Sequence, residues 1–195
     1  MQTVDYNREE ILSLLEERFS GRNLTTYNVA MLTLSHRFLK LSDAFCLLSN
    51  SGNILSAQHL LRPMFDCIMR LFTFSLLDEY YNISERVMHG EKFSKIKVTN
   101  IWPELFKNKK EISLSDMNIR RIMQGTGYYK GIDNFYNNTS EYIHFSLKHY
   151  YDLVRSVDSF RIGGADTVLH EPIVKEAVFD FNFLQNAFKG TISLC

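Results

Sequence analysis

The stretch that decides the fold is LLRPMFDCIMRLFTFSLL, residues 60–77. It is apolar nearly all round a helix, which is typical of the central element of a helical bundle. Its length almost suffices to cross a bilayer, but Arg62, Asp66 and Arg70 would make insertion prohibitively costly. The stretch therefore predicts a buried helix of a soluble protein, extending over residues 54–81.

Helical periodicity continues along the rest of the chain. It predicts seven helical segments, at about residues 5–19, 25–48, 54–81, 84–96, 113–124, 128–160 and 172–190. The short turn cluster at residues 49–53 folds the third segment antiparallel against the second, which gives a core hairpin over about residues 25–81. With only nine glycines, three prolines and no linker, the sequence predicts one all-α antiparallel bundle spanning residues 1–195.

Charge and cysteine usage limit where the chain works. Twenty-two Lys and Arg balance 22 Asp and Glu, so the whole chain lacks the basic excess of a nucleic-acid binder. The three cysteines are widely spaced and odd in number, which is typical of small core residues in a reducing compartment. The first ten residues are polar and include no apolar segment of a secretory signal. We therefore expect a cytoplasmic protein with no membrane-embedded part.

A charged stripe runs along the apolar helix. Steps of three, four and four residues place its members within a sector of about 80°, and they are His59, Arg62, Asp66 and Arg70. Charged groups are almost never fully buried unless they are paired. Two interpretations stay open: an ion-pair ladder that holds helices in register, or an active or ligand-binding site.

A second polar group lies in YNNTSEYIHFS, residues 136–146. Glu141 and His144 are three residues apart and Lys148 follows four further on, so all three share one helix face. In a functional interpretation, His144 is a general acid or base that the carboxylate orients, near cations that hold a phosphate. In a structural interpretation, it is a core histidine bonded to Asp66 or to a backbone carbonyl.

No metal or cofactor is predicted. Glu141-x-x-His144 matches one element of di-iron bundles, but the chain has no second copy of that element. His144 and His149 lie about 140° apart around a helix, which is the wrong spacing for joint zinc ligation. The sequence also lacks a nucleophile elbow, a phosphate-binding glycine loop and a Cys/His cluster, so ordinary hydrolases and nucleotide-binding proteins drop out.

Two short stretches, LLRPMFD at residues 60–66 and SEYIHFS at residues 140–146, together resemble a bacterial all-helical family of unknown function. That family is in turn similar to the HEPN superfamily of antiparallel bundles. HEPN proteins are often RNA-cleaving toxins or antiviral effectors, usually dimeric, in which an Arg-x(4–6)-His motif attacks RNA without a metal. The resemblance implies an HEPN-like bundle with His144 as the motif histidine.

The chain departs from the HEPN motif at the arginine. Asn137, Asn138 and Thr139 stand five to seven residues before the histidine, where the motif arginine belongs. Under the resemblance, the missing cation would have to come from Arg62 or Arg70 on the neighbouring helix.

Two functions follow from these patterns, beside an unrecognised small-molecule site. The first is a non-catalytic helical interaction protein, such as a subunit of a bacterial defence or toxin–antitoxin system, whose stripe and histidine form a buried polar network. The alternative is a metal-independent HEPN-like ribonuclease that uses His144 with Arg62 or Arg70. Burial discriminates between them, because a ribonuclease needs these side chains accessible near a dimer seam.

Two further features bear on partners. The basic run at residues 107–110, with Arg120, Arg121 and Lys130 beyond it, is either a nucleic-acid face or a solvated loop. Aromatic residues surplus to one core favour a homodimer. We therefore expect a homodimer, with a further protein or RNA as partner.

Overall fold

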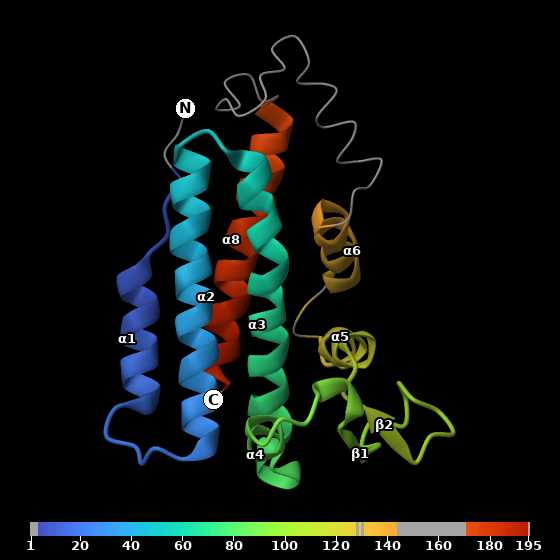
Figure 1. Ribbon diagram of the computed structural model, residues 1–195. Coiled ribbons are helices and arrows are strands. Elements are labelled where there is room, and N and C mark those ends of the chain that lie inside the picture. The colour runs from blue at the N-terminus through green and yellow to red at the C-terminus, as the bar shows by residue number, and fades with distance from the viewer. Residues whose placement is uncertain (1–3, 128, 130, 144–170, 195) are drawn as a thin grey trace.

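The computed structural model describes residues 4–127, 129, 131–143 and 171–194. Within these residues the protein is a helical bundle, as predicted, and it also contains one small β-hairpin that was not predicted (Figure 1). The helices are α1 (Arg8–Phe19), α2 (Thr26–Asn50), α3 (Ile54–Tyr81), α4 (Ile83–Met88), α5 (Asp116–Gly125), α6 (Ile132–Ile143) and α8 (Glu171–Ser193).

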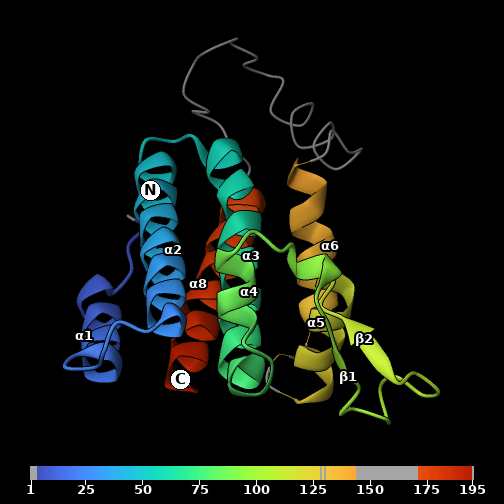
Figure 2. The same ribbon diagram turned by 60° about the horizontal axis from the view of Figure 1, so that its bottom comes forward.

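Helix α3 is the central element of the bundle. Helices α2, α8 and α6 all pack against it (Figures 1 and 2). Sixteen of its 28 residues are buried, which confirms the prediction from the apolar stretch. The predicted α2–α3 hairpin is also present: Gly52, with φ 82°, closes the turn, and the Asn53 side chain accepts a hydrogen bond from Ser56 N to cap α3.

The buried face of α2 alternates large and small side chains at steps of four and three residues. Its members, all fully buried, are Met31, Ser35, Phe38, Ser42, Phe45 and Ser49. Phe38 stacks on Phe188 of α8 with ring centroids 4.0 Å apart, and Phe45 stacks on Phe181 at 4.3 Å. Between the two stacks, Gln185 donates to the Ser42 hydroxyl at 2.9 Å. Side chains of α8 thus fill the spaces that the serines leave.

Helix α1 lies along the other side of α2 and α8 (Figure 1). It buries Ile11, Leu15 and Phe19 at steps of four residues. An ion pair of 2.7 Å between Lys189 and Glu10 ties it to the last turns of α8. The apolar side chains of α1 thus lie on the face that packs against the bundle.

The prediction of a helix over residues 84–96 was right only as far as residue 88. Helix α4 ends at Met88, because Gly90 adopts a φ of 90° that breaks the helix. A 3-10 turn (Phe93–Lys95) follows, and strands β1 (Lys97–Thr99) and β2 (Glu111–Ser113) then pair antiparallel with Val98 opposite Ile112. With three residues each, the strands are too short for their alternation to stand out in the sequence.

Other boundaries moved less. Helix α5 begins at Asp116 rather than near residue 113, because Ser115 is its N-cap. Helix α6 begins at Ile132 rather than near residue 128, because Gly131 has a φ of 83°. Helix α8 extends three residues beyond the predicted end. The predicted helix over 128–160 lies outside the described residues from residue 144 on.

Among the described residues, no helix combines the length and the apolar character that crossing a membrane requires.

The stacked phenylalanines should carry much of the core's stability. We expect Phe45→Ala to lower the free energy of unfolding by about 3 to 5 kcal/mol, because it leaves a cavity opposite Phe181. Leu47→Ala is the control on the same helix, since the Leu47 side chain is 72% exposed, and it should change stability by about 0.5 kcal/mol or less. Urea unfolding of both variants measures the difference, and equal effects would contradict the assignment of the core.

Candidate functional site

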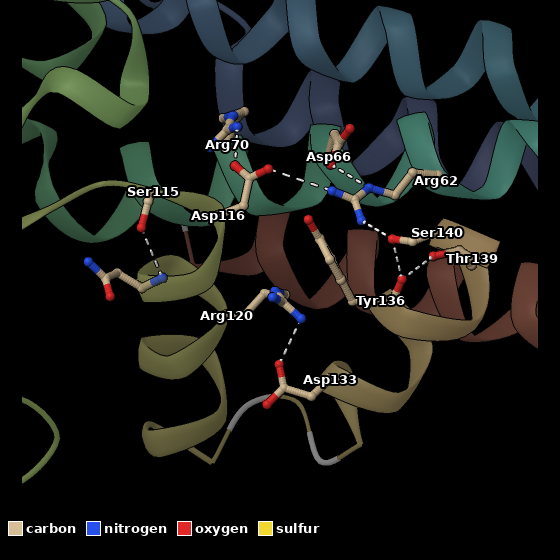
Figure 3. A network of polar contacts seen from close by, with 11 residues as sticks. Arg62, Asp66, Arg70, Ser115, Asp116, Arg120, Asp133, Tyr136, Thr139 and Ser140 are labelled. Atoms are coloured by element: carbon tan, nitrogen blue, oxygen red, sulfur yellow. Dashed lines mark hydrogen bonds and ion pairs between the residues drawn. The ribbon is translucent and has the colours of Figure 1, made fainter. Parts of the chain in front are cut away.

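Three arginines and three aspartates meet where α5 and α6 pack against α3 (Figure 3). We call this group, with the ring of Tyr136 and the hydroxyl of Ser140, the arginine–aspartate network. Its charged members are Arg62, Asp66 and Arg70 of α3, Asp116 and Arg120 of α5, and Asp133 of α6. The network therefore joins three helices.

Arg62 is the centre of the network and is only 8% exposed. Its Nε donates to Asp66 Oδ1 at 3.1 Å, and its Nη1 donates to Ser140 Oγ at 2.8 Å. Its Nη2 lies 3.6 Å from Asp116 Oδ2. Every nitrogen of this guanidinium thus has an oxygen partner, as a buried charge requires.

The ring of Tyr136 lies between two guanidinium groups. Arg62 Cζ is 3.5 Å from the ring centroid and Arg120 Cζ is 3.4 Å from it. Two cations this close to one centroid must lie on opposite faces of the ring, and Figure 3 shows Tyr136 between them. Arg120 also donates to Asp133 Oδ1 at 3.0 Å. Cation–π contacts on both faces therefore attach α6 to α3 and α5.

Asp116 bridges the two arginines of α3. Its Oδ1 accepts from Arg70 Nη2 at 2.5 Å while its Oδ2 faces Arg62. It is the first residue of α5, where a carboxylate also interacts favourably with the free backbone amides of the helix end. The Arg70 guanidinium lies 4.4 Å from the centroid of the Phe93 ring, and its Nη1 is buried without a hydrogen-bond partner among the described residues.

The charges of the network cancel. Three guanidinium groups face three carboxylates, so the cluster carries no excess charge that would attract a phosphate. Burial raises the pKa of Asp66 above its usual value; Arg62 opposes this shift and Asp116 adds to it. Asp66 therefore binds a proton more readily than an exposed aspartate does.

The structure brings together some of the predicted site residues. Arg62, Asp66 and Arg70 do share one face, but the link to Arg70 runs through Asp116 rather than directly from Asp66. His59 is exposed, and none of the contacts above includes it. The Glu141 side chain and all of His144 lie outside the described residues, so the predicted pairing of His144 with Asp66 stays a prediction.

Sequence reasoning missed the partners that α5 and α6 supply. Asp116 and Arg120 are four residues apart on α5, a spacing that places them on one helix face. Tyr136 and Ser140 have the same spacing on α6. These two pairs were the available signal, but nothing in the sequence states that both faces turn toward α3.

The described residues offer little other chemistry. They contain no group of three or more His, Cys, Asp or Glu side chains that could hold a metal ion. Burial raises the pKa of the Cys46 and Cys67 thiols to about 11 in each case. Both thiols are therefore protonated at neutral pH and poor nucleophiles.

Comparisons of this chain with protein-family models, with curated proteins and with solved structures found no match.

The bridging carboxylate should matter more than the peripheral one. We expect Asp116→Asn to lower the free energy of unfolding by about 1 to 3 kcal/mol, because Arg70 loses the carboxylate that it contacts and Arg62 keeps only Asp66. Asp133→Asn is the matched control, because its side chain is 48% exposed and bonds only to Arg120 among the contacts described here. It should cost about 1 kcal/mol or less. Chemical unfolding of the two variants side by side measures both losses of stability. A larger loss in Asp133→Asn than in Asp116→Asn would contradict the prediction.

The pKa of Asp66 should report its neighbours. Asp116→Asn removes a like charge and should lower this pKa, whereas Arg62→Met removes the opposing cation and should raise it further. Because the folded-state pKa of Asp66 is raised, its contribution to stability is present below the unfolded pKa and lost as pH rises through the folded pKa. NMR titration of the Asp66 carboxyl carbon measures both shifts. If either substitution left the pKa of Asp66 unchanged, the contact of Asp66 with that neighbour would be refuted.

Proposed function

We propose that this chain is a non-catalytic helical interaction protein in which the arginine–aspartate network is structural. The observation that carries the proposal is that each nitrogen of the buried Arg62 guanidinium lies near an oxygen partner. Its three nitrogens contact Asp66, Ser140 and Asp116, and Tyr136 covers one face of its plane. The resemblance to bacterial HEPN-like proteins suggests a subunit of a defence or toxin–antitoxin system as the setting.

A phosphate would have to compete for this guanidinium. To reach Arg62, it would have to displace the carboxylate of Asp66 or of Asp116, and both would then repel it at close range. Displacement would also leave a carboxylate partly buried without its cation, which is costly. The balanced charges and the carboxylates already at Arg62 favour a structural role of the network over a phosphate-binding site.

Exposed apolar side chains support a protein partner. Tyr80 of α3, Met117 of α5 and Phe179 of α8 are each more than 60% exposed. Aromatic and methionine side chains are enriched in protein–protein interfaces and often anchor them. The partner that we propose is an apolar protein surface, with a second copy of this chain as the first candidate, which light scattering of the purified protein tests directly.

One contact favours the alternative, a metal-independent HEPN-like ribonuclease that uses His144. Ser140, the first residue of the SEYIHFS segment, bonds to Arg62, so this segment starts against the charged stripe. In this alternative, Arg62 or Arg70 would hold the phosphate.

Incubation with RNA separates the two functions. We expect single-stranded and hairpin RNA to remain intact when incubated in EDTA with the purified wild-type chain. We expect the same RNAs to remain intact with the His144→Ala variant. Cleavage by the wild-type chain that His144→Ala abolishes would overturn the interaction hypothesis in favour of the ribonuclease.

Hydrogen exchange tests the structural role itself. Arg62→Met should speed amide exchange in α5 and α6, because both helices lose their central tie to α3. Arg37→Met is the control, since Arg37 is an exposed arginine on α2, and it should leave both helices unchanged. Unaltered protection in Arg62→Met would show that the network does not hold these helices.

A further inference from the structure

The positive charge of this neutral chain is concentrated on one projection. We define the lysine hairpin as residues 92–111, which include the 3-10 turn, β1, the connecting loop and the first residue of β2. It carries two glutamates and six lysines, Lys92, Lys95, Lys97, Lys107, Lys109 and Lys110. Figures 1 and 2 show β1, β2 and their loop extending away from the bundle beside α5. Charge that is balanced over the whole chain is therefore strongly unbalanced here.

The lysines of the hairpin are available. All six are exposed, and none forms an ion pair with any residue that the structure describes. Three of them, Lys97, Lys109 and Lys110, line one shallow hollow together with Asn118 of α5, and Glu111 is the one acidic residue of its lining. Like charges gathered in this way repel one another, and an anion in the hollow would relieve the repulsion.

The loop that carries three of the lysines is held in a defined shape. The Asn100 side chain donates to the carbonyls of Phe106 and Lys109, at 2.8 and 2.9 Å, and accepts from Trp102 N at 3.0 Å. Asn108 adopts a left-handed φ of 65° at the turn. Because the backbone is already ordered, binding would cost little loop entropy.

The composition of the hairpin favours phosphates over an acidic protein. Lysine is depleted in protein–protein interfaces, where aromatic and arginine side chains supply most of the binding energy. The hairpin has no arginine, and its Trp102 and Phe106 are turned inward, 9% and 3% exposed. Flexible lysine side chains without aromatic anchors fit an evenly charged backbone.

The same buried aromatics argue against single strands. Proteins that hold single-stranded nucleic acid stack its bases on exposed aromatic side chains. No tryptophan or phenylalanine of the lysine hairpin is exposed in this way. Contacts to phosphate position a protein on a duplex without reading its sequence. We propose that the lysine hairpin binds the phosphate backbone of a nucleic-acid duplex independently of sequence. The proposal stands apart from the arginine–aspartate network and does not depend on its role.

Fluorescence anisotropy with the full chain tests the proposal. The probes are DNA and RNA duplexes of about 24 base pairs with the same sequence, titrated over a range of salt concentrations. The test variant is Lys107→Gln, Lys109→Gln and Lys110→Gln combined. The control is Arg22→Gln, Arg37→Gln and Lys40→Gln combined, which removes the same charge from exposed positions near α1 and on α2. Circular dichroism confirms that both variants are folded.

We expect the wild-type chain to bind at least one duplex with an affinity that falls as salt rises. The hairpin variant should bind about tenfold more weakly or worse, with a salt dependence whose slope is smaller by about 3, one unit for each lost phosphate contact. The control should stay within about twofold of wild type, because its charges lie elsewhere. The two duplexes distinguish a DNA backbone from an RNA backbone.

Several outcomes would overturn the proposal. Equal losses in the two variants would mean that net charge alone drives binding. Tighter binding to the matching single strand would exclude a duplex as the ligand. Competition by poly-L-glutamate as strong as that by duplex at equal charge would assign the surface to an acidic protein. If the wild-type chain bound neither duplex at low salt, the proposal would be refuted.

Discussion

A guanidinium on the buried face of a helix must keep its donors bonded, and the positions of α5 and α6 depend on this demand at Arg62. Helix α3 itself supplies only Asp66. The remaining nitrogens need oxygens from elsewhere, and Asp116 of α5 and Ser140 of α6 provide them. The flat faces of the group add a second demand, which Tyr136 meets by stacking. One buried cation thus contacts oxygen atoms from all three helices.

The two kinds of cation in this chain do different work. The arginines of the network are partly or fully buried and matched by carboxylates, because a planar guanidinium can bond and stack in several directions at once. The hairpin lysines remain in water without an acidic partner among the described residues. A strongly hydrated ammonium on a flexible stem loses little by staying exposed. Charge that organises the fold is therefore separate from charge that is available to a ligand.

The sequence predicts the features of this structure that depend on residues close together in the chain, and not those that depend on residues far apart. The stripe on α3 and the α2–α3 hairpin follow from helical spacing and one turn cluster, which are local. The bond between Arg70 and Asp116 joins residues 46 positions apart, and no local pattern encodes it. Strands β1 and β2 have three residues each, below the length at which alternation becomes visible. The site was thus half predictable: its α3 side was, and the partners across the interface were not.

The core and the network attach their helices by different physics. Helices α2, α3 and α8 bury stacked phenylalanines and apolar side chains, whose attraction is non-directional and tolerates small shifts. Helix α6 also packs Phe135 against Phe65 and Phe183, and Ser140 and Tyr136 add directional contacts with Arg62. Hydrogen bonds weaken steeply with angle and distance, so a small displacement of α6 would break several together. The polar contacts of α6 with Arg62 therefore depend on its position more sharply than its apolar packing does.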